Sequence, residues 1–239
     1  MKRNYFIGIA IGVVLWLCIG TVCCQTVMPM AAPTAGSNIV VLDPGHGGMD
    51  GGAESGDGTC EKDINLAIAK YLKVLLEKQG IRVVLTRTND EGLYHDTGKE
   101  AIRTLKTQDM KARKARIDGS GADLTVSIHL NSFTQDSAVR GAQVFYPSDG
   151  DETLVKRSKY AAELMQNALN QSINGDSPRT ALGKNDVFLL KDITGPIVIA
   201  ECGFLSNPQD RDHLKDANHQ KIISGVLNEC IVKYLKTVD

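Results

Sequence analysis

Three apolar runs rich in β-branched residues each stop at a residue that can bind metal or transfer a proton. Their sequences are VVLDPGHGG at 40–48, VSIHLNS at 126–132 and IVIAECGFLSNP at 197–208. Runs of this kind are typical of buried parallel strands, and such sheets bind ligands beyond the carboxyl ends of their strands. We therefore expect an α/β fold that brings side chains from three distant segments to one edge of a sheet.

The polar residues at these run ends indicate a metal site. His46 follows the first run, His129 lies in the second, Glu201 ends the third, and Glu61 begins a helix after the first. Two neutral imidazoles and a carboxylate, with a fourth position open, are the ligand set of a catalytic zinc ion. A further carboxylate then remains as a base. The residues predict a zinc hydrolase.

Each candidate also has a structural alternative. His129 lies inside an apolar strand, where a hydrogen-bonded core histidine is common, and the charge of Glu61 suits the start of a helix. Glu201 follows four apolar residues, and an unpaired buried carboxylate needs a cation, donors or a raised pKa. His46 stands between glycines, so metal binding is favoured there. The spacing is not a local metal motif, and the residues alone leave both interpretations open.

Alternating strands and helices predict one three-layer α/β domain over residues 39–239, with a mixed, mostly parallel sheet flanked by helices. Asn207 and Pro208 fit a helix N-cap and first helical position. The polar stretch 88–108 lacks periodicity, and connections of that length are usually functional or mobile. The expected strands are 39–43, 81–87, 124–130, 141–147, 187–190 and 197–201, and the expected helices are 62–79, 109–118, 152–170 and a final helix with an apolar stripe from 222 to 234.

The N-terminus predicts export. Lys2 and Arg3 precede an apolar run that ends at Cys24, and such a run can span a bilayer with its positive end in the cytoplasm. We expect residues 1–24 to be a membrane anchor or a cleaved signal peptide and residues 25–38 to be a tether. No clear A-x-A cleavage site follows, and Cys23 lacks a convincing lipobox. Either alternative places the domain outside the cytoplasm, anchored to the membrane or secreted.

Charge and cysteine content exclude two classes of protein. The net charge of −1 gives no electrostatic reason to expect nucleic acid as a partner. Three cysteines lie in the domain (Cys60, Cys202 and Cys230), an odd number that does not suggest a disulfide scaffold. Cys202 follows Glu201 on an extended strand, so the two side chains should point to opposite faces and Cys202 should pack in the core.

The combined pattern resembles a known family. The blocks DPGHGGMDGGA, EKDINLAIAKYL, VVLTR, SIHLNS and ECGFLSNP occur in the order seen in zinc-dependent N-acetylmuramoyl-L-alanine amidases of the type-3 family, and they cover residues 39–236. The resemblance implies that His46, Glu61 and His129 bind one zinc ion and that Glu201 is the catalytic carboxylate. It also implies a peptidoglycan substrate, cleaved between the lactyl group of N-acetylmuramic acid and L-alanine.

Further blocks resemble the amidases of spore-forming bacteria that act on spore cortex. They are EGLYHDTG, QDMKARKARI, GAQVFYP and RTALGKNDVFLLK. This subgroup implies removal of stem peptides as a step toward muramic-δ-lactam, which is recognised at germination. No separate wall-binding module is evident, so we expect attachment through the catalytic face, the N-terminal segment or a partner. An accessory membrane- or wall-associated protein could clamp 88–108 and raise zinc occupancy; the alternative is that 88–108 only shapes the substrate groove.

Three more residues are candidates for contacts around the site. Asn131 and Ser132, just beyond His129, are expected to support a ligand or touch substrate. Arg87 is expected either to meet a peptide carboxylate or to form a structural ion pair. Two other functions stay open: a catalytically silent peptidoglycan-binding module, which would normally have lost a ligand or the base, and another zinc peptidase or amidohydrolase.

Overall fold

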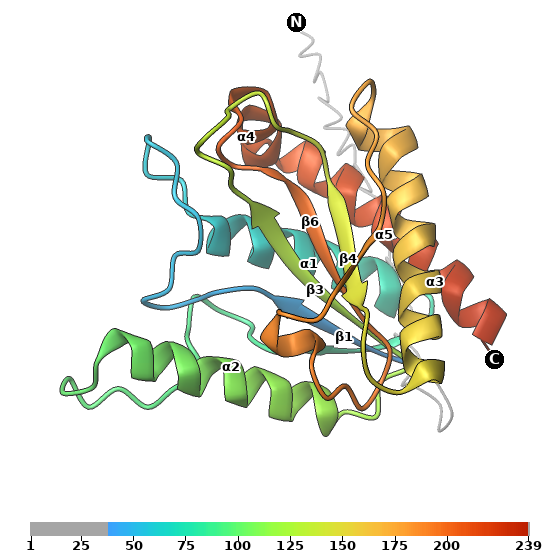
Figure 1. Cartoon of the computed structure of the whole chain (residues 1–239), viewed down its shortest axis with the longest axis horizontal. Coiled ribbons are helices and arrows are strands. Elements are labelled where there is room, and N and C mark those ends of the chain that lie inside the picture. The colour runs from blue at the N-terminus through green and yellow to red at the C-terminus, as the bar shows by residue number, and fades with distance from the viewer. Residues whose placement is uncertain (1–37, 239) are drawn as a thin grey trace, which may run out of the picture. The chain divides into compact units, whose positions relative to one another are not determined.

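Six strands form one sheet in the part of the chain that the computed structural model describes, residues 38–238. The strands are β1 (Ile39–Pro44), β2 (Arg82–Leu85), β3 (Leu124–Asn131), β4 (Gln143–Pro147), β5 (Leu182–Lys184) and β6 (Ile197–Phe204). Their order is β2-β1-β3-β6-β4-β5 (Figure 1). The first four in this order are parallel, whereas β4 runs antiparallel to β6. The expected mixed, mostly parallel sheet is confirmed.

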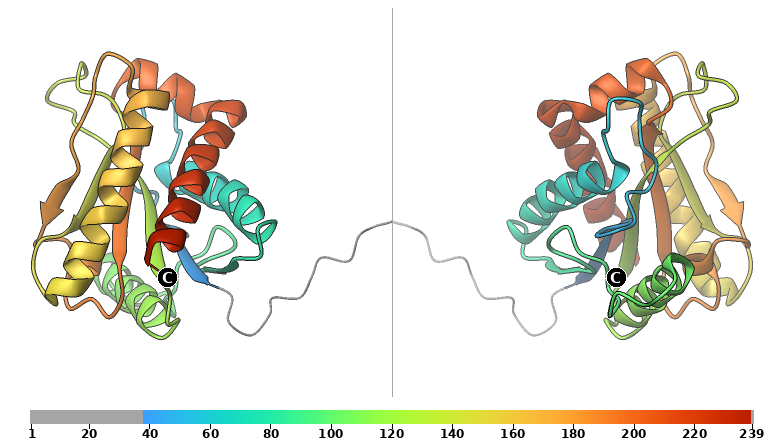
Figure 2. Two further views of the ribbon diagram at one scale, coloured as in Figure 1. Left: turned by 90° about the vertical axis from the view of Figure 1, so that its right-hand side faces the viewer. Right: turned by 90° about the vertical axis from the view of Figure 1, so that its left-hand side faces the viewer.

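Helices cover both faces of the sheet (Figure 2). Buried side chains of α1 (Glu61–Glu77), α3 (Glu152–Leu169) and α5 (Ala217–Val238) share one apolar cluster with the sheet. On the other face, α2 (Ile102–Asp118) and the short 3-10 helix η2 (Phe188–Leu190) pack over a smaller cluster. The helix α4 (Pro208–Lys215) follows β6, and the π-helical turn η1 (Asn170–Asn174) follows α3. This is the expected three-layer arrangement.

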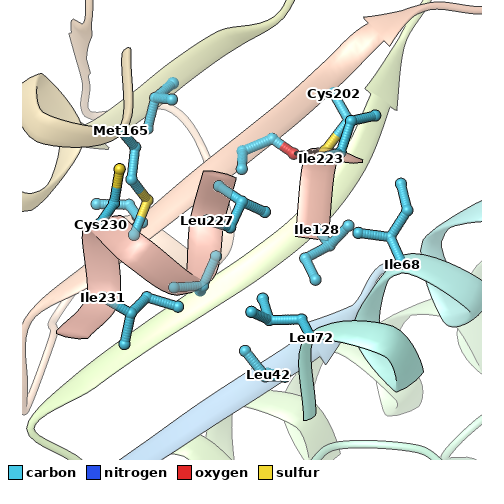
Figure 3. Close-up of a cluster of buried hydrophobic side chains, with 14 of the residues drawn as sticks. Leu42, Ile68, Leu72, Ile128, Met165, Cys202, Ile223, Leu227, Cys230 and Ile231 are labelled. Atoms are coloured by element: carbon cyan, nitrogen blue, oxygen red, sulfur yellow. Dashed lines mark hydrogen bonds between the residues drawn. The ribbon is translucent and has the colours of Figure 1, made fainter. Parts of the chain in front are cut away.

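The larger core forms because side chains alternate across the sheet. On β3, Val126 and Ile128 enter the cluster under α1 and α5, and both are 0% exposed. Leu72 of α1 and Leu227 of α5 meet them there (Figure 3). Burial of each such side chain contributes about 1.5–3 kcal/mol to folding. Cys202 belongs to the same cluster, which confirms its expected place in the core.

The start of α4 shows how a short local signal fixes a boundary. The Oδ1 atom of Asn207 accepts a hydrogen bond from the backbone N of Asp210 at 3.0 Å, and Pro208 is the first helical residue. Because β6 runs directly into this turn, the capped helix holds the carboxyl end of β6 in place. Both sequence assignments at this turn are confirmed.

Helix α2 begins earlier than expected. It starts at Ile102 rather than 109, so the irregular connection covers only 88–101. The buried residues of α2 are Leu105, Asp109 and Arg113, and two of these are charged. The missed residues 102–108 contain one buried side chain, Leu105, so no apolar periodicity marks this part of the helix.

The prediction of a strand at residues 187–190 is wrong. The last three residues of this segment form the 3-10 helix η2 (Phe188–Leu190). Leu189 and Leu190 are both buried, and Phe188 is 42% exposed. Two adjacent buried residues do not fit the two-residue period of a strand that covers one face of a sheet. The true edge strand is β5, a short pairing with β4 in a stretch that reads as loop because it is mostly exposed.

The expected anchor or signal segment at 1–24 lies outside the described residues, as does the tether up to residue 37. Within residues 38–238, no helix has the length and apolar character needed to cross a membrane.

Candidate metal and catalytic site

The carboxyl ends of β1, β3 and β6 bring the predicted residues together. These three strands are adjacent and parallel, and His129 is the register partner of Glu201. Donor atoms of His46, Glu61 and His129 all lie within 4.8 Å of one another, the spacing of side chains that can share one metal ion. Among residues 38–238 this is the only such group of three.

Glu61 lies between the two imidazoles. It is the first residue of α1 and is 3% exposed. Its Oε1 atom is 3.2 Å from His46 Nε2 and 3.0 Å from His129 Nδ1. Burial raises the pKa of this carboxyl, but the hydrogen bonds and charges of His129 and His46 outweigh burial and hold the pKa well below its usual range. A role confined to the helix start does not explain this placement.

The other carboxylate oxygen of Glu61 fixes its orientation. Oε2 accepts a hydrogen bond from the backbone N of Ala53 at 2.8 Å, while Oε1 also accepts from the backbone N of Leu130 at 2.9 Å. Each donor belongs to the segment that carries one of the histidines, since Leu130 follows His129 and Ala53 ends the loop after His46. These hydrogen bonds therefore fix the position of the Glu61 carboxylate relative to both imidazoles.

His46 is aimed by the loop that follows β1. Its backbone is left-handed, with φ 63°, which is uncommon for a residue other than glycine. Its Nδ1 is 2.9 Å from Asp50 Oδ2, and Lys106 Nζ is 2.8 Å from the other oxygen of Asp50. A hydrogen bond of this kind at one ring nitrogen orients the imidazole and leaves the opposite nitrogen for a metal. The sequence prediction missed Asp50.

Protonation of His46 reflects the same surroundings. Burial lowers the pKa of His46, but the hydrogen bonds to Asp50 and Glu61 more than compensate and raise it to about 9. Two carboxylates thus attract positive charge to this imidazole, and either a proton or a metal cation can supply it.

The glycines of the DPGHGGMDGG block provide room for the ligands. A Cβ atom on Gly45 would lie 2.2 Å from Cε1 of His129. On Gly52 a Cβ would lie 2.6 Å from Oε2 of Glu61 and 2.7 Å from Cδ2 of His46. Because no real Cβ tolerates such distances, these positions require glycine for the ligand side chains to keep their places.

We expect Gly45→Ala to lower zinc affinity by about 10- to 100-fold, the range seen when the support of a metal ligand is disturbed. The added methyl group would displace the His129 ring. Gly56→Ala is the matched control, since a Cβ there has nothing within 4 Å. Competition with a chelator of known affinity measures the difference, and equal affinities for the two variants would show that His129 does not need the space.

Glu201 supplies a second carboxylate beside the ligand group. Its Oε2 atom is buried and has no hydrogen-bond partner among the described residues. Burial raises the pKa of Glu201 to about 7, with help from Glu61, against the opposing charges of His129 and His46. A buried polar atom without a protein partner is rare, and a bound water molecule or ion normally satisfies it. The donor set and this oxygen together fit a zinc ion with a water molecule beside it.

A buried charge network supports the loop that carries His46, and it was not foreseen. Asp43 is fully buried and accepts hydrogen bonds from Ser127 Oγ at 2.7 Å and from Arg113 Nη1 at 2.8 Å. Arg113, from α2, also donates to the backbone oxygens of Pro44 and His46. Burial raises the pKa of Asp43, but the Arg113 charge and the hydrogen bonds outweigh burial and lower it. The only sequence signal was an aspartate at the end of an apolar strand.

Arg87 has a structural role. It is 1% exposed and donates to four backbone oxygens, among them Gly45 O at 3.0 Å and Lys62 O at 2.7 Å. These bonds join the loop after β1 to the first turn of α1. Its hydrogen-bond partners are backbone carbonyls rather than a carboxylate, and a contact between Arg87 and a peptide carboxylate stays a prediction.

Asn131 and Ser132 lie at the end of β3, at the edge of the site. The register of β3 with β6 shifts between His129 and Asn131, and Asn131 Oδ1 accepts a hydrogen bond from the backbone N of Ser132 at 2.8 Å. Asn131 also accepts a backbone hydrogen bond from Leu205. These contacts hold the chain as it leaves the site, and a role toward ligand or substrate stays a prediction.

Residues 40–232 match the family described as N-acetylmuramoyl-L-alanine amidase. The germination-specific N-acetylmuramoyl-L-alanine amidase of Bacillus subtilis is 32% identical over 206 residues, which cover 86% of this chain and 83% of that protein. The N-acetylmuramoyl-L-alanine amidase AmiA of Escherichia coli is 28% identical over 250 residues, covering 88% of this chain and 81% of AmiA.

The fold is shared with solved structures of the same kind. The CwlD amidase from Clostridioides difficile, solved in complex with the GerS lipoprotein, is 40% identical with a TM-score of 0.79. The match covers 85% of this chain and 100% of that one. An N-acetylmuramoyl-L-alanine amidase from Clostridium difficile 630 is 29% identical with a TM-score of 0.70, covering 84% and 98% of the two chains.

Proposed function

The chain belongs to the N-acetylmuramoyl-L-alanine amidase family and is a peptidoglycan amidase, and from this premise we propose how it works. His46, Glu61 and His129 hold one zinc ion, and Glu201 is the catalytic carboxylate. The bond cleaved joins the lactyl group of N-acetylmuramic acid to L-alanine. The observation that carries this proposal is the convergence of three donor atoms within 4.8 Å beside a buried carboxylate oxygen that lacks a partner.

Each of the three side chains offers one donor atom to the metal. His46 offers Nε2 because Asp50 occupies Nδ1, and Glu61 offers the oxygen that lies between the imidazoles. When bound, a zinc ion in such a site acidifies water and polarises a substrate carbonyl. A carboxylate and two imidazoles leave a fourth tetrahedral position for water or substrate.

Glu201 moves the proton in this reaction. Its unpartnered Oε2 accepts a proton from the attacking water as the new carbon–oxygen bond forms at the lactyl carbonyl. The same oxygen then donates this proton to the alanine nitrogen as the amide bond breaks, so that a free amine and a lactyl carboxylate leave. A pKa raised to about 7 suits a group that must accept and return a proton near neutral pH.

The proposed metal site makes zinc binding pH-dependent. In the metal-free protein the pKa of His46 is raised to about 9, so below that pH a proton must leave before zinc can bind. We expect the apparent zinc affinity to fall by about tenfold per pH unit, for each proton displaced, as pH decreases below 9. Chelator competition between pH 6 and 9 measures this slope. An affinity independent of pH would contradict displacement of a proton from the ligand set.

A catalytically silent binding module is not favoured. Such a module would normally lack a ligand or the base, whereas all four residues are present: the donor atoms of His46, Glu61 and His129 lie within 4.8 Å of one another, and Glu201 is the register partner of His129.

We further propose that the natural substrate is spore cortex. The names of two relatives support this, since one is called germination-specific and the other was solved with a lipoprotein. Removal of stem peptides would expose muramic acid for conversion to muramic-δ-lactam by another enzyme. Cortex lies outside the cytoplasm, so the apolar segment at 1–24 would serve export, as an anchor or a signal. An accessory lipoprotein would then reach the domain from the same side of the membrane.

Digestion of purified cortex tests this part of the proposal. The zinc-loaded protein should release peptides that begin with L-alanine and leave muramic acid without peptide on an intact glycan. Mass spectrometry separates these products from those of a carboxypeptidase, which would shorten peptides that stay attached. Release from vegetative wall but none from cortex would contradict the cortex assignment and leave the amidase activity standing.

A further inference from the structure

Helix α2 and the short 3-10 helix η2, which pack against each other, border an apolar groove. The groove has a volume of about 590 Å³. Two large apolar side chains stand open to solvent in its walls, with Ile102 60% exposed and Phe188 42% exposed. The full lining is Ile102, Arg103, Lys106, Thr107, Met110 and Phe188.

One wall of the groove contacts a residue that supports the metal site. Lys106, in its wall, is 2.8 Å from Asp50, which in turn holds His46. Met110, which also lines the groove, packs on the cluster that contains Ile199. Ile199 and Glu201 are two residues apart on β6, so their side chains leave the same face of the sheet. A substrate whose scissile bond lies at Glu201 can thus extend along α2.

The groove is lined by two cations, Arg103 and Lys106, and only Lys106 forms an ion pair among the described residues. Arg103 is exposed, and its guanidinium makes no hydrogen bond or ion pair within residues 38–238. Lys106 keeps half of its side chain exposed beside its contact with Asp50. No acidic residue lines the groove. An apolar surface with a free guanidinium at its edge fits a ligand that has small apolar groups and a carboxylate.

Of the two halves of the substrate, only the peptide has this chemistry. The glycan consists of N-acetylated sugars without charge once the lactyl group is in an amide, whereas the stem peptide carries alanine methyl groups and free carboxylates. We propose that the α2–η2 groove is the subsite for the stem peptide and that Arg103 pairs with the carboxylate of its second residue. This inference rests on the amidase function proposed above.

Two substrates that differ by one charge test the role of Arg103. Both are N-acetylglucosaminyl-N-acetylmuramoyl dipeptides; one carries L-Ala-D-Glu and the other L-Ala-D-isoglutamine, in which that carboxylate is an amide. Wild type should prefer the acid by about three- to tenfold in kcat/KM, mainly through KM, the effect of one charged hydrogen bond near the surface. Arg103→Gln should abolish the preference without changing kcat.

Lys111→Gln is the matched control, since Lys111 is an exposed cation of α2 that does not line the groove. It should keep the wild-type preference. Phe188→Ala should raise KM for both substrates alike, because the apolar wall does not discriminate charge. An unchanged preference in Arg103→Gln, or the same loss in Lys111→Gln, would overturn the proposal.

Binding without turnover keeps the two proposals separable. Calorimetric titration of the zinc-loaded Glu201→Gln protein with the free dipeptide L-Ala-D-Glu should show binding that weakens about three- to tenfold when Arg103 is also replaced by Gln. If wild type cleaves neither substrate, the proposed function is wrong, but this titration still shows whether the groove binds the stem peptide. Binding that does not depend on Arg103 would overturn the subsite.

Discussion

Glu201→Gln is expected to lower kcat by at least about 10²-fold, the scale of general acid–base catalysis, while the protein still binds one zinc ion per chain. Gln has nearly the shape of Glu but cannot accept the proton of the attacking water. Glu201 is not among the three metal-binding side chains, so the metal content should not change. Steady-state kinetics on muropeptides, together with metal analysis of the same sample, gives both values.

Glu163→Gln is a suitable control for this substitution. Glu163 is a half-exposed carboxylate on α3 that lies 3.7 Å from Lys159, one helical turn away, and its loss should leave kcat unchanged. Hydrolysis by Glu201→Gln at the wild-type rate would show that the catalytic base lies elsewhere. Loss of zinc together with activity would instead assign Glu201 to the metal ligands.

His129→Ala is expected to abolish stable zinc binding, because two protein ligands do not hold a tetrahedral zinc site. It also removes the imidazole that lies 3.0 Å from Glu61. Metal analysis should be made on protein shown to be folded by circular dichroism. If His129 were only a core histidine, the variant would be less stable but would bind a full equivalent of zinc per folded molecule.

His95→Ala serves as the matched control for the histidine series. His95 is exposed in the 88–101 connection and lies outside the ligand group. Its replacement should leave zinc content and activity as in wild type. A loss of zinc in His95→Ala equal to that in His129→Ala would mean that metal content reports general damage rather than a lost ligand.

The sequence predicted the ligand group because strand ends are easy to recognise. Each apolar run stops where its strand leaves the core, and parallel neighbours end at the same edge, so His46, His129 and Glu201 had to converge if the runs were adjacent in the sheet. Adjacency itself could not be read from the residues. It is set by packing of the whole sheet, and the family resemblance, rather than periodicity, supplied the order.

The supporting residues were harder to predict because their partners are distant in the chain. Asp43 and Arg113 form an ion pair although they are 70 residues apart in the sequence, and no local motif around either residue predicts this pair. The first two turns of α2 were missed because Leu105 is their only buried residue, so no apolar stripe marks them. Asp50 could have been inferred, since it stands four residues after His46 in a loop that must orient the ring.

We propose that one zinc ion, held by His46, Glu61 and His129, is required for cleavage at L-alanine. The most direct test titrates metal-free protein with zinc and follows release of L-alanine-initiated peptides by mass spectrometry. Activity should rise from zero and level off at one zinc per chain, with every product cut at the lactyl–alanine amide. Full activity in metal-free protein would show that zinc is not required, and cleavage at another bond would exclude the lactyl–alanine amide as the substrate bond.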